Sequence, residues 1–143
     1  MPEAVTSHTV HVDSEPSAVW DALQDPDTWQ AIGPIDDVSQ PLHREDGALS
    51  GFRWRTNLGG KHYNGTATMT VCEPNTKYGL RLDTSEITGD ILTLVTPTSD
   101  GVAVTVTLTF RTKGMLSAMF FPAIKQALAS GFPEQVEAFA ASF

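Results

Sequence analysis

The sequence is poor in cysteine, since Cys72 is the only one among its 143 residues. No disulfide can form within the chain, which suits a reducing compartment. The first residues, MPEAVTSHTV, have neither the basic start nor the apolar run of roughly 7–15 residues that a secretory signal needs. No stretch approaches the ~20 apolar residues of a membrane-spanning helix. We therefore predict a cytoplasmic protein without a transmembrane segment.

Basic residues are also scarce. The chain has 9 lysines and arginines against 17 acidic residues, which gives a formal net charge of −8. This excess repels a phosphate backbone or an anionic bilayer unless a local basic patch overcomes it. The nearest candidate for such a patch is Arg53, Arg55 and Lys61, which are too few to do so. We expect no nucleic-acid partner.

Motifs of common nucleophile and cofactor sites are missing. There is no GxSxG, P-loop or dinucleotide-binding fingerprint, and Gly59-Gly60 fits a hairpin turn rather than a phosphate cradle. His8 and His11 lie three residues apart on a predicted strand, so their side chains point to opposite faces. His43 and His62 have no acidic or thiol neighbour at ligand spacing. We expect no metal site and no cofactor.

The composition is that of an ordinary folded protein, with 41% hydrophobic and 18% charged residues, and its length suits one domain over residues 1–143. Alternation over residues 6–12 predicts a half-buried strand. The segment 13–16 offers N-cap residues and a proline for a first helical turn. A short helix follows, which Asp25-Pro26-Asp27 ends, and Asp27 is a candidate cap for another turn around Thr28-Trp29.

From Ile35 onward the pattern has period two and is interrupted by turn signals near residues 46, 59, 74, 85 and 100. The clearest strand is Val102–Phe110, in which valine, leucine and phenylalanine alternate with alanine and threonine. Ile91–Val95 is apolar on both faces, so its inward side cannot be read. About six such strands with short connections predict an antiparallel meander with one dry face.

The C-terminal part of the sequence changes to a helical period. An apolar stripe recurs every three or four residues, at Phe120, Ile124, Leu128, Phe132, Val136 and Phe139. Pro122 marks either a kink or the start of the main helix, and Pro133 either begins a final piece or bends one continuous helix. A continuous helix over residues 115–141 would be roughly 40 Å long.

The residues VHVDSEPSAVWDAL at positions 10–23 and DPDTW at positions 25–29 resemble the opening of the START-like superfamily, also called SRPBCC or helix-grip. Within it, the chain is similar to the polyketide cyclase/dehydrase and lipid-transport families. The resemblance implies an α+β helix-grip fold, in which a curved antiparallel sheet of about seven strands (β-α-α-β6-α) wraps around a long C-terminal helix. It also implies a ligand cavity between the sheet and that helix.

The predicted cavity wall is the apolar inward set of the sheet and helix. Gly65 and Ala67 are small inward residues that leave room for a void, whereas most of the bulky residues would fill a core in any protein. The predicted lining residues are Phe52, Trp54, Tyr63, Ala67, Met69, Leu80, Leu82, Val104, Val106, Met115, Met119, Phe120 and Ile124.

Few polar groups are candidates for that cavity. Tyr63 is either a ligand-orienting phenol or a core aromatic whose hydroxyl lies at the rim. His8 lies on the apolar face of the first strand. Arg53 and Arg55 flank Trp54 and face solvent, unless a bulge turns them inward as anchors for a carboxylate. Gln135 falls within the apolar arc of the helix if that helix is continuous.

These features favour a carrier or sensor that binds a small hydrophobic molecule, such as a lipid or a polyketide-like compound. The alternative is an enzyme of the cyclase or dehydratase type, in which Tyr63, His8 or an inward arginine performs the acid–base work. A third hypothesis is a protein-interaction module. The sequence specifies neither the ligand and its charge nor the oligomeric state.

Overall fold

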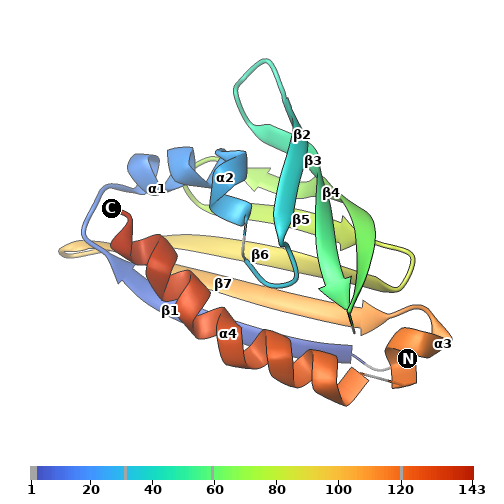
Figure 1. The fold of residues 1–143 in the computed structure, drawn as a ribbon. Coiled ribbons are helices and arrows are strands. Elements are labelled where there is room, and N and C mark those ends of the chain that lie inside the picture. The colour runs from blue at the N-terminus through green and yellow to red at the C-terminus, as the bar shows by residue number, and fades with distance from the viewer. Residues whose placement is uncertain (1–2, 31, 59, 120) are drawn as a thin grey trace.

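The computed structural model describes residues 3–30, 32–58, 60–119 and 121–143. The described strands form one seven-stranded antiparallel sheet in the order β1-β7-β6-β5-β4-β3-β2 (Figure 1). The helices lie on its concave face. This arrangement confirms the predicted α+β helix-grip fold. The elements are β1 (Glu3–Val12), α1 (Pro16–Leu23), α2 (Pro26–Trp29), β2 (Asp37–His43), β3 (Leu49–Leu58), β4 (Lys61–Glu73), β5 (Lys77–Asp83), β6 (Ile87–Thr98), β7 (Gly101–Thr112), α3 (Met115–Met119) and α4 (Phe121–Ala141).

Every predicted turn signal falls between two strands. The tightest example is the connection from β6 to β7, where Gly101 has a φ of +150°. A Cβ atom at this position would lie 2.4 Å from the carbonyl oxygen of Val12 on the neighbouring strand β1. Only glycine therefore fits, because it has no Cβ and tolerates positive φ.

The structure resolves the inward face of β6, which the sequence left open. Ile91, Thr93 and Val95 are buried, whereas the residues between them are half-buried. Thr93 pairs with Tyr78 on β5 and with Val106 on β7, and it shares their inward face. One polar residue of this apolar segment therefore points into the core.

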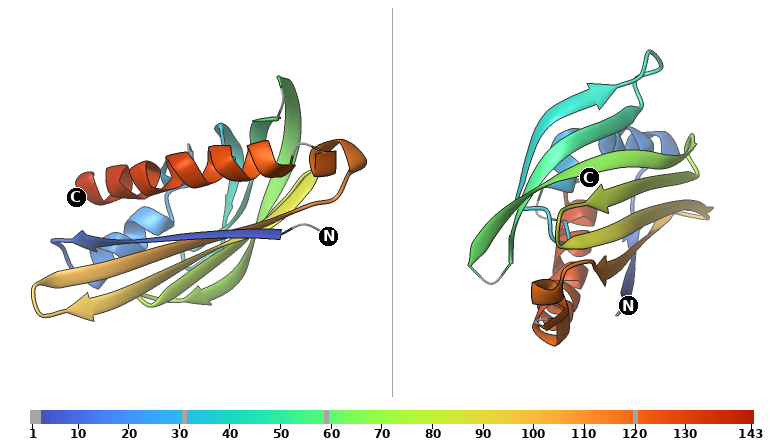
Figure 2. Two further views of the ribbon diagram at one scale, coloured as in Figure 1. Left: turned by 90° about the horizontal axis from the view of Figure 1, so that it is seen from below. Right: turned by 90° about the vertical axis from the view of Figure 1, so that its right-hand side faces the viewer.

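The described residues of the C-terminal part form two helical elements, and the second is continuous through Pro133. α3 ends at Met119, and α4 begins at Phe121 with Pro122 in its first turn. α4 runs to Ala141, about 31 Å at 1.5 Å per residue, instead of the roughly 40 Å of a single helix. It crosses the concave face along β1, while β2–β5 curve around its other side (Figure 2).

α1 and α2 cover the end of the sheet where α4 also ends (Figure 1). Trp20 and Trp29 both contact the ring of Tyr78 on β5, with centroid distances of 5.8 and 5.9 Å. The Tyr78 hydroxyl donates a hydrogen bond to the carbonyl of Leu49. Phe132 and Val136 of α4 are buried in the same core cluster. This end of the molecule is therefore held by aromatic packing on both sides of Tyr78.

Candidate functional site

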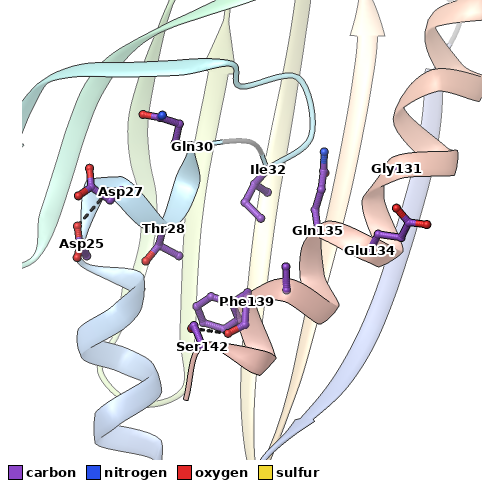
Figure 3. A pocket seen from close by; sticks show the side chains of 11 residues that line it. Asp25, Asp27, Thr28, Gln30, Ile32, Gly131, Glu134, Gln135, Phe139 and Ser142 are labelled. Atoms are coloured by element: carbon purple, nitrogen blue, oxygen red, sulfur yellow. Dashed lines mark hydrogen bonds between the residues drawn. The ribbon is translucent and has the colours of Figure 1, made fainter.

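An open groove of about 620 Å³ separates the α2 segment from the second half of α4 (Figure 3). We call it the α2–α4 groove. One wall is built by α2 and the residues that flank it, and the other by α4 and Ser142. The lining residues are Asp25, Asp27, Thr28, Gln30, Ile32, Gly131, Glu134, Gln135, Ala138, Phe139 and Ser142.

The α2 wall is fixed by local hydrogen bonds. The Asp25 carboxylate caps α2 by accepting a hydrogen bond from the Asp27 backbone N–H at 2.9 Å, so Asp25, rather than Asp27 as the sequence suggested, is the cap. Thr28 Oγ1 donates to the carbonyl of Ala22 at 2.5 Å, and Trp29 Nε1 donates to that of Leu23 at 3.0 Å. α2 is thereby held against the end of α1.

The α4 wall depends on the continuity of the helix through Pro133. Because the helical phase is kept, Gly131, Gln135 and Phe139 follow one another at four-residue spacing along the groove. The Gln135 side-chain oxygen accepts a hydrogen bond from the Gly33 N–H at 2.8 Å. Gln135 therefore connects α4 to the loop after α2, and it lines the groove while doing so.

Beneath the groove lies a small internal space of about 10 Å³, which we call the inner void. It has room for roughly one water-sized group. The groove and the inner void share Thr28, Ile32 and Phe139, so these side chains separate the outer space from the inner one. The lining residues of the inner void are Leu23, Thr28, Trp29, Ile32, Thr93, Val106, Val136 and Phe139.

Thr93 lines the inner void, whose accessible surface is apolar, and its Oγ1 is enclosed beside that space. Its side chain is fully buried, and its Oγ1 has no hydrogen-bond partner among the described residues. A buried hydroxyl without a partner costs about 1–3 kcal/mol. Groups of this kind are rare in folded proteins, and a binding role is one explanation for them. Trp54 Nε1 and Thr112 Oγ1, elsewhere on the inward face of the sheet, are also buried without a hydrogen-bond partner among the described residues.

The charge of the groove is negative. Asp25 and Asp27 lie on one wall and Glu134 on the other (Figure 3), and the described lining includes no lysine, arginine or histidine. None of the described ion pairs involves these three carboxylates. Both walls of the groove therefore carry exposed carboxylates outside any described ion pair, and we call this exposed edge the mouth of the groove.

Most of the predicted lining residues lie in the core, and Val106 lines the inner void. Phe52, Trp54, Ala67, Leu80, Leu82 and Val104 are buried in the main cluster, while Tyr63, Met69 and Ile124 are half-buried. Met115 and Met119 of α3 are 86% and 72% exposed. Phe120 lies outside the described residues. Apart from Val106, none of the described residues in this set lines the groove or the inner void.

The space that the sequence analysis expected beside Gly65 is filled. The Trp54 indole lies so close to Gly65 that an added Cβ would be 2.5 Å from Trp54 Cε2. The two residues are direct cross-strand partners on β3 and β4. The small residue therefore makes room for a large neighbour, and this position offers no room for a ligand.

The predicted polar candidates are dispersed. His8 Nε2 lies 2.9 Å from Glu137 Oε1, so His8 joins β1 to α4. Tyr63 lies under Lys61, whose Nζ is 5.5 Å from the ring centroid. Arg53 and Arg55 are exposed on the opposite face of β3 from Trp54. The structure therefore does not bring these four residues together, and their role in a cavity stays a prediction.

A second open pocket, of about 340 Å³, lies between α1 and the residues that precede β3 and end β4. Trp20, Asp21, Gln24, Asp46, Gly47, Ala48, Cys72 and Pro74 line it. Arg44 binds Asp46 beside it, with Nε 3.2 Å from Oδ1. This hydrogen bond lowers the pKa of the Asp46 carboxyl and raises that of Arg44. The Cys72 Sγ lies 3.8 Å from the Arg44 guanidinium.

Two further observations concern metals and membranes. Within the described ranges, no group of three or more histidine, cysteine, aspartate or glutamate side chains is placed to hold a metal ion. No helix in the described part of the chain combines the length and apolar character needed to cross a membrane.

Sequence reasoning did not single out the α2–α4 groove or Thr93. The groove combines residues about a hundred positions apart, and no short motif marks such a pairing. Thr93 was hidden because both faces of Ile91–Val95 read as apolar. The sequence did contain one sign of Thr93: it is the polar residue in the otherwise apolar run Ile91–Val95. Ile91 and Val95, two positions away on either side, are buried and share its face.

Solved structures of similar fold cover almost the whole chain. The Zhui aromatase/cyclase from Streptomyces sp. R1128 superposes with a TM-score of 0.71 at 15% identity, covering 98% of this chain and 94% of that chain. A START superfamily protein from Mycobacterium smegmatis gives 0.69 at 17% identity, covering 94% and 92%. At this identity the likeness establishes the fold. A search of curated protein sequences finds no match.

The sequence profile of one family matches as well, over residues 3–143. Its description is polyketide cyclase / dehydrase and lipid transport. This confirms the resemblance that residues 10–29 carried. Because the match spans nearly the entire sequence, this chain belongs to the polyketide cyclase/dehydrase and lipid transport family.

Proposed function

We propose that this protein binds a small, mainly apolar molecule in the α2–α4 groove, with one polar atom reaching Thr93 in the inner void. The observation that carries this proposal is the unpaired, fully buried hydroxyl of Thr93, which lies in the lining of an inner void that shares three side chains with the open groove. A ligand oxygen at that point would satisfy the hydroxyl. Removing that penalty would favour the bound state.

The path from the groove to the inner void leads past Ile32 and Phe139, which line both spaces. Phe139 is half-buried and lies close to the end of the chain, where its ring contacts Phe143 at 5.2 Å. A ligand atom that reaches the inner void must displace the Phe139 side chain, because this ring lines both spaces.

The acid–base candidates predicted from the sequence do not support catalysis in the groove, and of the groove carboxylates Asp25 is engaged as the cap of α2. A cyclisation or dehydration needs at least two such groups within hydrogen-bond reach of one substrate. His8 is engaged by Glu137, and the two arginines lie on the outer face of β3. None of the three lines the groove or the inner void. The family description names both transport and cyclase or dehydrase activity.

The proposal is tested by nuclear magnetic resonance with decan-1-ol as the probe, below its solubility limit. We expect saturable 1:1 shifts of Thr93, Val136 and Phe139 signals, with smaller changes at Tyr63 and Arg53. Thr93→Val should weaken decan-1-ol binding about tenfold, which is the effect of one lost hydrogen bond.

Thr112→Val is the matched control, because it removes another unpaired buried hydroxyl that lines neither space. It should leave the affinity for decan-1-ol within about twofold of the unmodified protein. Two results would each overturn the proposal: no saturable shift at Thr93, Val136 and Phe139, or equal weakening by the two valine variants.

A further inference from the structure

We propose that the molecule bound in the α2–α4 groove is an uncharged or amine-bearing amphiphile, and that Asp25, Asp27 and Glu134 exclude molecules ending in a carboxylate. This inference rests on the proposed function and adds the charge class of the ligand. It follows from two independent features, namely the charge at the mouth of the groove and the unpaired Thr93 hydroxyl enclosed at its inner end.

The mouth of the groove is lined by carboxylates on both walls. Asp25 and Asp27 are exposed on the α2 side, and Glu134 is exposed on α4. No basic side chain is among the described residues that line the groove, so no cation offsets them locally. The formal charge of −8 adds a repulsion of the same sign over the whole surface.

The inner end can hold a polar atom but not a charge. The Thr93 Oγ1 is unpaired there, and no charged side chain is among the described residues that line the inner void. An ion placed in such a space would be desolvated without an opposite charge, which is strongly unfavourable. A hydroxyl or carbonyl oxygen would be accepted, since Thr93 can both donate and accept.

These two features orient the ligand. Its apolar body lies between Ile32 and Phe139, a neutral polar atom is directed at Thr93, and any charged group lies at the mouth. A cation at the mouth is attracted by Asp25, Asp27 and Glu134, whereas a carboxylate is repelled by all three. The arginines that were candidates for holding a carboxylate, Arg53 and Arg55, are exposed on the other face of the sheet.

Three probes of equal chain length separate the charge classes: decylamine, decan-1-ol and decanoate, each below its aggregation concentration at pH 7. We expect decylamine to bind about tenfold or more tightly than decanoate at low ionic strength. The ratio should shrink as sodium chloride is raised, because these carboxylates are exposed and salt screens them. Decan-1-ol should bind with intermediate affinity.

The decisive variant is D25N/D27N/E134Q, which removes the three charges and keeps side chains of similar shape. Asparagine retains the oxygen that caps α2. We expect the ratio of decylamine to decanoate affinity to fall to about twofold or less in this variant. The control D36N/D37N/E45Q neutralises three exposed carboxylates that do not line the groove, and should retain most of the ratio.

The outcomes separate this inference from the proposed function. Decanoate binding as tightly as decylamine, or equal effects of the two triple variants, would overturn the charge selection. If decan-1-ol still shifts the Thr93 signal under those conditions, the binding proposal stands without it. If none of the three probes shifts Thr93, both proposals fall together.

Discussion

Thr93 brings a hydroxyl into a part of the core whose other wall residues are mainly aliphatic and aromatic. In the unliganded protein this hydroxyl is a source of instability, because desolvation is not offset by a hydrogen bond within the described residues. Residues at binding sites often carry such a cost, and substitutions that relieve it raise stability while they reduce function. Substitution of Thr93 tests whether stability and ligand binding change in opposite directions in this protein.

Thr93→Val should raise the free energy of unfolding of the unliganded protein by about 1 kcal/mol, because valine has nearly the shape of threonine and no polar atom. The measurement is denaturation by urea, followed by circular dichroism. Thr93→Ser keeps the hydroxyl and removes a buried methyl group, so it should lower stability by about 1 kcal/mol. A valine variant less stable than the unmodified protein would show that the hydroxyl is already satisfied.

Tyr78 links stability to pH at the alkaline end. Burial raises the pKa of its hydroxyl above the ordinary value of 10.0. Above pH 10 the unfolded chain loses this proton while the folded protein keeps it, so folding stability falls as pH rises. The loss approaches about 1.4 kcal/mol per pH unit for this one group.

Tyr78→Phe removes both the titration and the hydrogen bond to the Leu49 carbonyl. At pH 7 the variant should be less stable by about 1 kcal/mol, because the carbonyl loses its partner. Between pH 10 and pH 11.5 this difference in stability should shrink and then reverse. Only the unmodified protein has a Tyr78 that ionises on unfolding, so only its stability falls for this reason as pH rises. Urea denaturation at a series of pH values measures it. Parallel stability curves for the two proteins would contradict this account.

The strands and their turns were readable in the sequence because alternation and turn residues act locally. Val102–Phe110 alternates between an apolar and a threonine-rich side, and it is buried on the apolar side as expected. The phase of β6 was not readable, because Leu92 and Leu94 on its outer side are also apolar. Pairing with Tyr78 and Val106 decides it, and pairing partners are a tertiary property.

The C-terminal helix illustrates a second limit. Two prolines in an amphipathic pattern allow several divisions, and the sequence does not rank them. Pro122 fits the first turn of α4, where no intrahelical N–H is needed, whereas Pro133 lies inside the helix and leaves one carbonyl without its partner. Packing of Phe132 and Val136 in the core, on either side of Pro133, holds the helix together there.

Gln135 provides a test of how α4 positions the groove. Gln135→Ala removes the acceptor of the Gly33 N–H and should expose that amide to exchange. We expect hydrogen exchange at Gly33 to accelerate about tenfold, which corresponds to one lost hydrogen bond. The control Glu137→Ala removes the contact to His8 on β1 and should leave Gly33 unchanged. Equal exchange at Gly33 in the unmodified protein and in Gln135→Ala would show that this bond does not hold the loop.

The molecule has two different ends along α4. At one end, α1, α2 and the last turns of α4 enclose Tyr78 and the inner void; at the other, Phe121 packs on Phe110 of β7 at 5.6 Å and α3 exposes Met115 and Met119. Sequence reasoning identified the two faces that meet, the sheet and the helix. It did not show at which end of α4 the groove would lie, because that depends on how closely the helix and the sheet pack at each point.

If the α2–α4 groove is the ligand site, protection on binding should be confined to one end of the molecule. Saturation with decylamine should slow hydrogen exchange in α2, in the loop through Gly33 and in the second half of α4, because a bound ligand stabilises the folded state that binds it. The β2–β3 hairpin should not respond beyond the change in global stability, and it serves as the internal reference. Hydrogen exchange measured by mass spectrometry resolves these segments. Protection centred instead on α3 and the first turns of α4 would place the ligand at the opposite end of the molecule and contradict the site described above. α3 and Phe121 precede Gln135 and Phe139 by several helical turns.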